Sequence, residues 1–276
     1  MNTLLARLVS RERTDSRRIA LAIPTRNRAG MVAALARAQA TEFRIGEICV
    51  RDNASSPDEY EQLRAGLAGL GSHVRLARNE TDLGVQLNKA AVLRDCTLPW
   101  ALLFDSDNQF DHRLLDAFFR PRAWSESVVY CPQRANPNFD FTPLAGRPLD
   151  RGAVAQLLQG PQHRLMLAFL NMANYLVPVR AFLQVQQPYL GAPIFGADAM
   201  LSALVWLQAG GVLQVMRRAH YVHNVHDGSY FKSVAGMSKP LVRQLAAAAA
   251  TRSREALDEA LARFRVGAPA PEGAAA

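Results

Sequence analysis

The chain has 276 residues, and 49% of them are hydrophobic, which excludes a disordered chain and permits a substantial buried core. The formal net charge is +8, but the basic residues are scattered among acidic ones and no nucleic-acid-binding motif occurs, so we expect no nucleic-acid partner. A ligand that carries a pyrophosphate, or an anionic membrane surface, suits this charge better. Excess arginine that only solvates the surface is the alternative.

The N-terminal residues and the cysteines predict a cytoplasmic protein. Residues 1–18 carry five arginines and two acids, and their only apolar run is too short for a secretory signal. No stretch reaches the roughly 18 apolar residues of a transmembrane helix, so we expect at most peripheral contact with the inner face of the cell membrane. Cys49, Cys96 and Cys131 are widely spaced and lack the paired spacing of a zinc site, which favours reduced, buried thiols.

Predicted strands and helices alternate along the first 110 residues. Apolar runs predict strands at 19–23, 47–51, 73–77 and 100–104. Helical composition and spacing predict helices at 31–40, 58–70 and 85–94. This alternation indicates a parallel sheet with crossover helices, in which ligands bind beyond the carboxyl ends of the strands.

The second half of the chain is less regular. Strands are predicted at 128–132, 175–178 and 212–216, and helices at 198–209 and 241–264. Loops are predicted at 136–151 and 220–231, and a disordered tail at 267–276. The predicted organisation is a basic lead-in (1–18), one main domain (19–240), a C-terminal helix (241–265) and a tail (266–276).

Two polar clusters follow the first two predicted strands. Residues 24–28 read Pro-Thr-Arg-Asn-Arg and place hydroxyl, amide and guanidinium donors at the sheet edge. Capping of the next helix by Thr25 or Asn27 explains the same residues. Asp52 can accept a hydrogen bond from a pyrimidine ring N–H, and an Asx turn is its alternative role.

A third cluster, Asp105-Ser106-Asp107, follows a buried strand. Two carboxylates held close together repel each other, and a divalent cation relieves that repulsion while also binding phosphate oxygens. An ordinary polar loop is the alternative. Further along, Asp198 opens a predicted helix that it could simply cap, and His223 and His226 lie in a polar loop.

The chain contains, in this order, the segments IALAIPTRNR, ICVRDNASSP, NETDLGVQLNKA, ALLFDSDNQF, FGADAML and VHDGS. Each resembles a segment of the family 2 glycosyltransferases of the GT-A fold, and together they extend over roughly residues 19–229. The resemblance implies an α/β, Rossmann-like fold whose central sheet is mostly parallel, with helices on both faces.

The resemblance also implies roles on the donor side. Thr25 and Asp52 would hold the base of the nucleotide. The full set of implied nucleotide-sugar-binding residues is Pro24, Thr25, Asn27, Arg28, Asp52, Gly84, Asn88, Asp105 and Ser106.

A metal site and a catalytic base are implied by the same family. Asp105, Asp107 and His226 would hold Mn²⁺ or Mg²⁺, and His223 competes with His226 for the histidine position. Asp198 would be the general base that deprotonates the acceptor hydroxyl. The family commonly has Glu-Asp at this position, where this chain has Ala197-Asp198.

The implied activity is inverting transfer of a sugar from a nucleotide-sugar, with UDP expected, to a hydroxyl of a glycan or lipid-linked acceptor in surface polysaccharide or glycolipid assembly. A non-catalytic nucleotide-sugar-binding protein is one alternative. A phosphohydrolase of the haloacid dehalogenase type is another, because its motif is also an apolar strand followed by Asp-x-Asp. That motif normally lies near the N-terminus, however, and its later paired-Asp loop is absent here.

Overall fold

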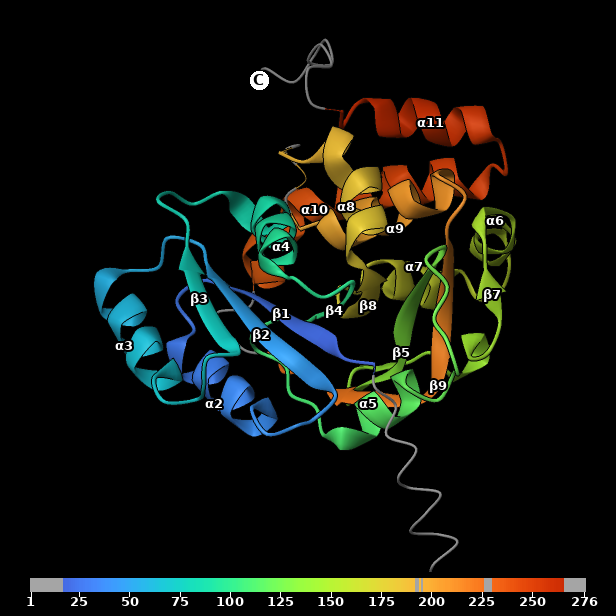
Figure 1. Ribbon diagram of the computed structural model, residues 1–276. Helices are drawn as coiled ribbons and strands as arrows, with labels where there is room; N and C mark the ends of the chain where they lie inside the picture. The colour runs from blue at the N-terminus through green and yellow to red at the C-terminus, as the bar shows by residue number, and fades with distance from the viewer. Residues whose placement is uncertain (1–16, 192–193, 195, 226–229, 266–276) are drawn as a thin grey trace, which may run out of the picture.

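The apolar runs of the sequence form the middle of a nine-stranded sheet (Figure 1). The computed structural model describes residues 17–191, 194, 196–225 and 230–265. The strands lie in the order β3-β2-β1-β4-β8-β5-β9-β7, and β6 pairs with β5 off this path. Their bounds are β1 Ile19–Thr25, β2 Ile45–Asp52, β3 Val74–Arg78, β4 Trp100–Leu103, β5 Val128–Asn136, β6 Phe139–Asp140, β7 Pro148–Leu149, β8 Tyr175–Pro178 and β9 Val212–Val222.

The sheet is mostly parallel, as the alternation of strands and helices predicts. Strand β1 pairs in parallel with β2 and β4, and β2 pairs in parallel with β3. Strand β8 is antiparallel to β4 and β5, whereas β5 and β9 run parallel. In the parallel part, Thr25 pairs with Asp52 and Asp52 with Arg78, so three strands end side by side at one edge of the sheet.

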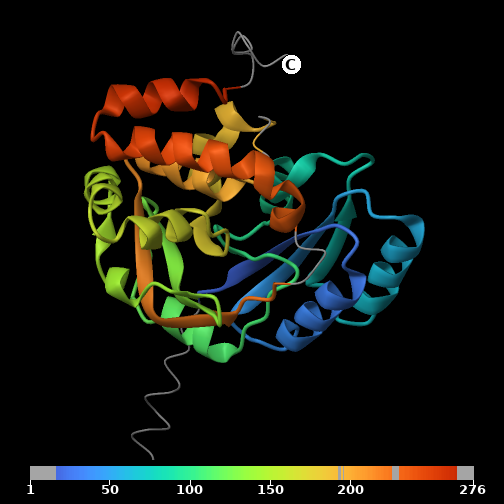
Figure 2. The ribbon, with the colours of Figure 1, turned by 180° about the vertical axis from the view of Figure 1, so that it is seen from behind.

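Helices cover both faces of the sheet (Figures 1 and 2). Their bounds are α2 Ala29–Gln39, α3 Pro57–Leu67, α4 Gly84–Asp95, α5 His112–Phe118, α6 Arg151–Gln159, α7 His163–Leu170, α8 Val179–Gln186, α9 Asp198–Gln208, α10 Tyr230–Ala250 and α11 Arg254–Ala262. Helices α2 and α3 pack together on one face, and α4 lies on the other with α8, α9 and α10 beside it (Figure 1). Because both faces are covered, β1 is a continuous apolar run in which Ile19, Leu21 and Ile23 are fully buried.

Several elements in the middle of the chain differ from the sequence prediction. Helix α5 was not predicted. The predicted loop at 136–151 contains β6, β7 and a short 3₁₀ helix, Thr142–Leu144, and helices α6, α7 and α8 were not predicted either. These elements are two to nine residues long. Hydrophobic periodicity does not separate such short pieces from loops.

The C-terminal region also differs from the prediction. Strand β9 continues to Val222, and α10 begins at Tyr230, so residues 220–222 and 230–231 of the predicted loop are regular structure. The single helix predicted at 241–264 is two helices, which separate where Arg252 adopts a φ of 61° and the Ser253 side chain caps α11. The predicted division after residue 240 falls inside α10. None of the helices in the described part of the chain has the length and apolarity needed to cross a membrane.

Candidate active site

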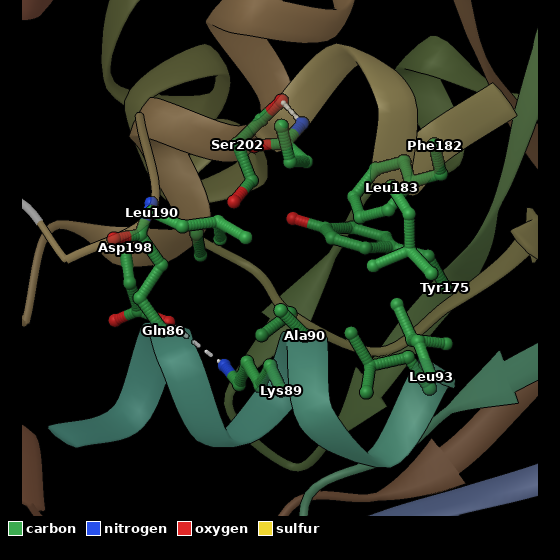
Figure 3. A pocket seen from close by; sticks show the side chains of 14 residues that line it. Gln86, Lys89, Ala90, Leu93, Tyr175, Phe182, Leu183, Leu190, Asp198 and Ser202 are labelled. Atoms are coloured by element: carbon green, nitrogen blue, oxygen red, sulfur yellow. Dashed lines mark hydrogen bonds and ion pairs between the residues drawn. The ribbon is translucent and has the colours of Figure 1, made fainter. Parts of the chain in front are cut away.

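A lysine without a role predicted from the sequence joins two of the predicted acids. The ammonium of Lys89, on α4, lies 2.9 Å from a carboxylate oxygen of Asp198 (Figure 3). It also lies 3.5 Å from a carboxylate oxygen of Asp105. Burial lowers the pKa of Lys89, but the two carboxylates raise it by more, so its pKa lies above the ordinary value. The lysine therefore stays charged and keeps the carboxylates of Asp105 and Asp198 close to each other.

Asp105 lies just beyond the end of β4, as the apolar run before it predicts. Its backbone N–H donates to the Asn174 side-chain oxygen at 2.8 Å, which anchors the turn. Burial raises the pKa of Asp105, Lys89 opposes that shift, and the nearby carboxylates of Asp107 and Asp198 add to it. This carboxyl therefore lies within a cluster of acids and cations, and burial is the largest cause of its raised pKa.

Asp107 lies beside a second cation and beside the loop that follows β9. The Arg28 guanidinium is 3.5 Å from its carboxylate. The side-chain N–H of Asn224 donates to the backbone oxygen of Asp107 at 2.6 Å, and the Asn224 backbone N–H donates to the Asn108 side chain at 3.1 Å. These bonds bring the Asp-x-Asp turn and the late loop together, as the order of the motifs predicts.

His223 is the histidine of this loop that lies within the described residues. Its ring nitrogen is 3.0 Å from the Asn138 amide, and its ring lies 5.6 Å from that of Phe139. Burial lowers the pKa of His223, and the carboxylates of Asp105 and Asp107 raise it by less, so the imidazole is neutral at pH 7. His226 lies outside the described residues.

The turn after β1 is tied to the turn after β2. The Asn27 side-chain oxygen accepts from the Ser56 backbone N–H at 3.0 Å, and the backbone N–H of Asn27 donates to the Ser55 hydroxyl at 2.7 Å. The residue before α2 is Arg28, which makes no side-chain cap bond, so capping by Thr25 or Asn27 does not explain this segment. Pro24 is half-buried on β1.

Two hydroxyls at this edge of the sheet are buried without a hydrogen-bond partner among the described residues. They are the side-chain oxygens of Thr25 and Ser106. A buried hydroxyl that lacks a partner is costly, so such groups in a native protein usually have a ligand or a water. Both residues were predicted to contact the nucleotide-sugar.

Asp52 is fully buried, and its carboxylate already has partners. It accepts from the backbone N–H of Ser55 at 3.1 Å and makes a short bond with the Ser55 hydroxyl, which is the Asx-type turn considered from the sequence. Arg78 lies 3.3 Å from the same carboxylate and stacks over Tyr60. A base that binds here would therefore share Asp52 with Ser55 and Arg78.

Asn88 belongs to a buried network of side-chain amides next to the ends of β2 and β3. Its side-chain oxygen accepts from Asn79 at 2.9 Å, and its side-chain N–H donates to the Arg51 backbone oxygen at 3.2 Å. Gly84 opens α4 with a φ of 76°, a conformation that favours glycine. Both residues thus set the position of α4, and α4 carries Lys89.

The comparison with known families identifies this arrangement. The sequence profile described as glycosyl transferase family 2 matches residues 20–171, more than half of the chain. The chain belongs to glycosyl transferase family 2. It is a glycosyltransferase, and the phosphohydrolase alternative is excluded. Among curated protein sequences, no match was found.

Solved structures share the fold of this family 2 chain. TarS 1-349 of S. aureus in complex with UDP-GlcNAc is 17% identical with a TM-score of 0.63, covering 90% of this chain and 71% of that one. The mannosyltransferase PcManGT of Pyrobaculum calidifontis, in complex with GDP-Man and Mn²⁺, is 14% identical with a TM-score of 0.58, covering 90% of this chain and 69% of that one. At such identities the likeness establishes the GT-A architecture.

The glycosyltransferase fold also brings together two cysteines that are far apart in the sequence. Cys49 and Cys96 lie with Glu47 so that one ligand atom of each is within 4.8 Å of the others, although their spacing does not predict a paired site. The Glu47 carboxylate already accepts from the backbone N–H groups of Thr97 and Leu98 at 2.7 and 2.8 Å. All three cysteines are free thiols, with Cys96 only half-buried.

Proposed function

We propose that this enzyme transfers a sugar from a UDP-linked donor to an acceptor hydroxyl, with inversion at the anomeric carbon. The observation that carries the proposal is the Lys89 ammonium between Asp105 and Asp198. Lys89 joins Asp105, which follows β4, to Asp198, which is expected to act as the general base. In open α/β sheets, ligands bind beyond the carboxyl ends of the strands, where Thr25, Asp52 and Asp105 lie.

We propose that Asp105 and Asp107, near the end of β4, hold a divalent metal ion. Asp105 and Asp107 offer carboxylate oxygens, and their side chains are 33% and 13% exposed, so an ion can reach them. His223 offers a neutral imidazole, the form that binds metals, and His226 stays the competing candidate. A bound Mn²⁺ or Mg²⁺ supplies charge that stabilises the nucleoside diphosphate leaving group.

The chain's own side chains account for the remaining steps. The carboxylate of Asp198 takes the proton from the acceptor hydroxyl as that oxygen attacks the anomeric carbon. Lys89 is a positioning residue that holds Asp198 against α4, and Arg28 adds positive charge beside Asp107. One displacement without a covalent intermediate inverts the configuration.

The proposal extends to the acceptor and to where in the cell the enzyme acts. The acceptor is a glycan or lipid-linked hydroxyl in surface polysaccharide or glycolipid assembly. The enzyme works at the inner face of the cell membrane, where the arginines of residues 1–18 contact anionic lipid.

Calorimetry of UDP with Mn²⁺ and with EDTA tests the donor site. We expect UDP to bind at least about tenfold more tightly with Mn²⁺, since the ion binds phosphate oxygens and relieves the repulsion between the carboxylates. Asp107→Asn should remove this metal dependence. Asp111→Asn is the matched control, because Asp111 caps α5 and makes only an exposed ion pair with Arg113, and asparagine caps a helix equally well. Equal UDP affinity with Mn²⁺ and EDTA would overturn the metal-dependent donor site.

A further inference from the structure

A pocket without an assigned role lies beside the ion pair of Lys89 and Asp198 (Figure 3). It is formed by α4, α8, α9 and β8 and opens to solvent. Most of its wall is apolar, with side chains that include Ala90, Leu93 and Phe182. A wall of this kind favours an apolar group and disfavours a phosphate or a bare sugar hydroxyl.

Three side chains in the pocket have at least one polar atom without a partner among the described residues, although the Gln186 side-chain N–H donates to the Ser202 backbone oxygen at 3.0 Å. Among the described residues, no partner exists for either side-chain polar atom of Gln86, for the Tyr175 hydroxyl or for the Gln186 side-chain oxygen. These residues are only 8%, 4% and 3% exposed, so water does not readily satisfy them. Figure 3 shows the Tyr175 hydroxyl pointing into the pocket.

We propose that this pocket binds the acylamino group of a hexosamine ring, of which the N-acetyl group is the simplest. Such a group has one N–H donor, one carbonyl acceptor and a methyl group. The Gln86 amide offers an acceptor and a donor, and the Tyr175 hydroxyl offers either. The methyl group then contacts the apolar wall. An O-acetyl group has the carbonyl and the methyl group but lacks the N–H donor.

The location decides which molecules can carry this group. Asp198 lines the pocket, so the proposal rests on the proposed function, in which Asp198 meets the acceptor hydroxyl. Donor and acceptor rings both meet at the reacting carbon. The acylamino group therefore belongs to the donor sugar or to the acceptor sugar, and the experiment separates the two.

Two substitutions isolate the pocket from the rest of the site. Tyr175→Phe removes the hydroxyl alone, and Gln86→Leu replaces the amide with an apolar group of similar size. Because neither polar group has a partner among the described residues, both variants should melt at the same temperature as the wild type or above it. Tyr130→Phe is the matched control, because the Tyr130 hydroxyl accepts from the Ser125 N–H at 2.9 Å and is absent from the pocket lining.

The donor arm compares UDP-GlcNAc, UDP-glucose and UDP by calorimetry with Mn²⁺. The first two differ only where an acetamido group replaces a hydroxyl. We expect UDP-GlcNAc to bind about tenfold more tightly than UDP-glucose, as the gain of one or two buried hydrogen bonds implies. Tyr175→Phe and Gln86→Leu should remove this preference and leave the affinity for UDP unchanged, while Tyr130→Phe should keep both.

The acceptor arm titrates the methyl glycosides of N-acetylglucosamine and of glucose into protein loaded with UDP and Mn²⁺. A preference for the acetamido sugar that appears here, and depends on Tyr175, assigns the pocket to the acceptor. If neither arm shows a preference while UDP binds normally, the pocket assignment is overturned and the donor site stands. If UDP does not bind, the proposed function fails, and the glycosides are then titrated into nucleotide-free protein, where equal binding overturns the pocket as well.

Discussion

The Lys89 ammonium lies 2.9 Å from the Asp198 carboxylate, although the two residues are 109 positions apart in the sequence. The same ammonium lies 3.5 Å from Asp105, so one cation serves two acids from different elements. Its side chain is 13% exposed, so solvent screens these pairs only weakly. The distance between the predicted base and the predicted metal site therefore depends on Lys89.

Lys89→Met should destabilise the fold and make its stability depend more strongly on Mn²⁺. The substitution keeps an apolar stem but leaves the buried Asp198 and the half-buried Asp105 without the ammonium, and we expect a loss of about 3 kcal/mol in the free energy of unfolding. Mn²⁺ should then raise the melting temperature of Lys89→Met more than that of the wild type, since the ion replaces the missing positive charge. Thermal unfolding with and without Mn²⁺ measures both effects.

The exposed Lys239 on α10 supplies the control for this experiment. Lys239→Met should change neither the melting temperature nor its response to Mn²⁺. If Lys89→Met were as stable as the wild type and responded equally to Mn²⁺, the proposed role of Lys89 in holding the acids would be wrong.

The sequence predicts the sheet edge and its acids because both depend on local patterns. A buried parallel strand is a continuous apolar run, and the polar residues directly after it must lie at the edge of the sheet. Asp52 and Asp105 were found in this way. The family resemblance added Asp198, and the profile match to residues 20–171 then confirmed the family.

Lys89 and the pocket could not be predicted by the same means. A lone lysine within a helix looks like a surface residue in sequence, and its partner Asp198 comes from a helix far along the chain. The pocket depends on α8, a helix of eight residues that was not predicted, and on the packing of α8 against α4 and α9. Such long-range packing leaves no periodic signal in the sequence.

Asp52→Asn should weaken UDP binding about tenfold and reduce the preference for UDP over CDP and GDP. The proposed role of the Asp52 carboxylate is to accept from a uracil N–H, and a neutral amide accepts less well. Competition among the three nucleotides with Mn²⁺ measures both quantities.

Asp52 also holds the turn through Ser55, so a second variant separates the two roles. Ser55→Ala breaks the bond to the hydroxyl and leaves the carboxylate in place. It should lower the melting temperature without changing the order of nucleotide affinities. If Asp52→Asn left that order and the UDP affinity unchanged, Asp52 would be only a turn residue.

The N-terminal arginines should bind the protein to anionic membranes. Of the five arginines in residues 1–18, Arg17 packs over Trp124 with its guanidinium 4.4 Å from the ring centroid, and Arg18 directly precedes β1, so Arg7, Arg11 and Arg13 are the ones to replace. Each cation near an anionic surface gains about 1 kcal/mol. Replacing these three with glutamine should therefore reduce binding about 100-fold in a flotation assay with anionic vesicles.

Neutral vesicles are the control, since electrostatic attraction requires lipid charge. The wild type should float weakly with them, and the triple substitution should make little difference. Equal flotation of both proteins with anionic vesicles would contradict the role of the N-terminal arginines.

Asp198→Asn should keep the donor site and remove most of the transfer activity. Removal of a general base typically costs about 10²- to 10⁴-fold in rate, and we expect kcat to fall within that range. The affinity for UDP with Mn²⁺, measured by calorimetry, should change little, because Asp198 is not among the residues predicted to contact the metal ion or the uracil ring.

A purely structural role for Asp198 predicts a different result. Asp198 does not cap α9, because the cap position is Ala197, so its structural contribution is the ion pair with Lys89. Lys89→Met breaks that same pair but keeps the carboxylate. If the pair were all that mattered, Asp198→Asn and Lys89→Met would lose similar activity. If Asp198 is the base, Asp198→Asn should lose far more, and Asp258→Asn, at an exposed ion pair on α11, should lose nothing. Near-normal kcat in Asp198→Asn would refute the assignment, since an amide cannot accept the proton of the acceptor hydroxyl.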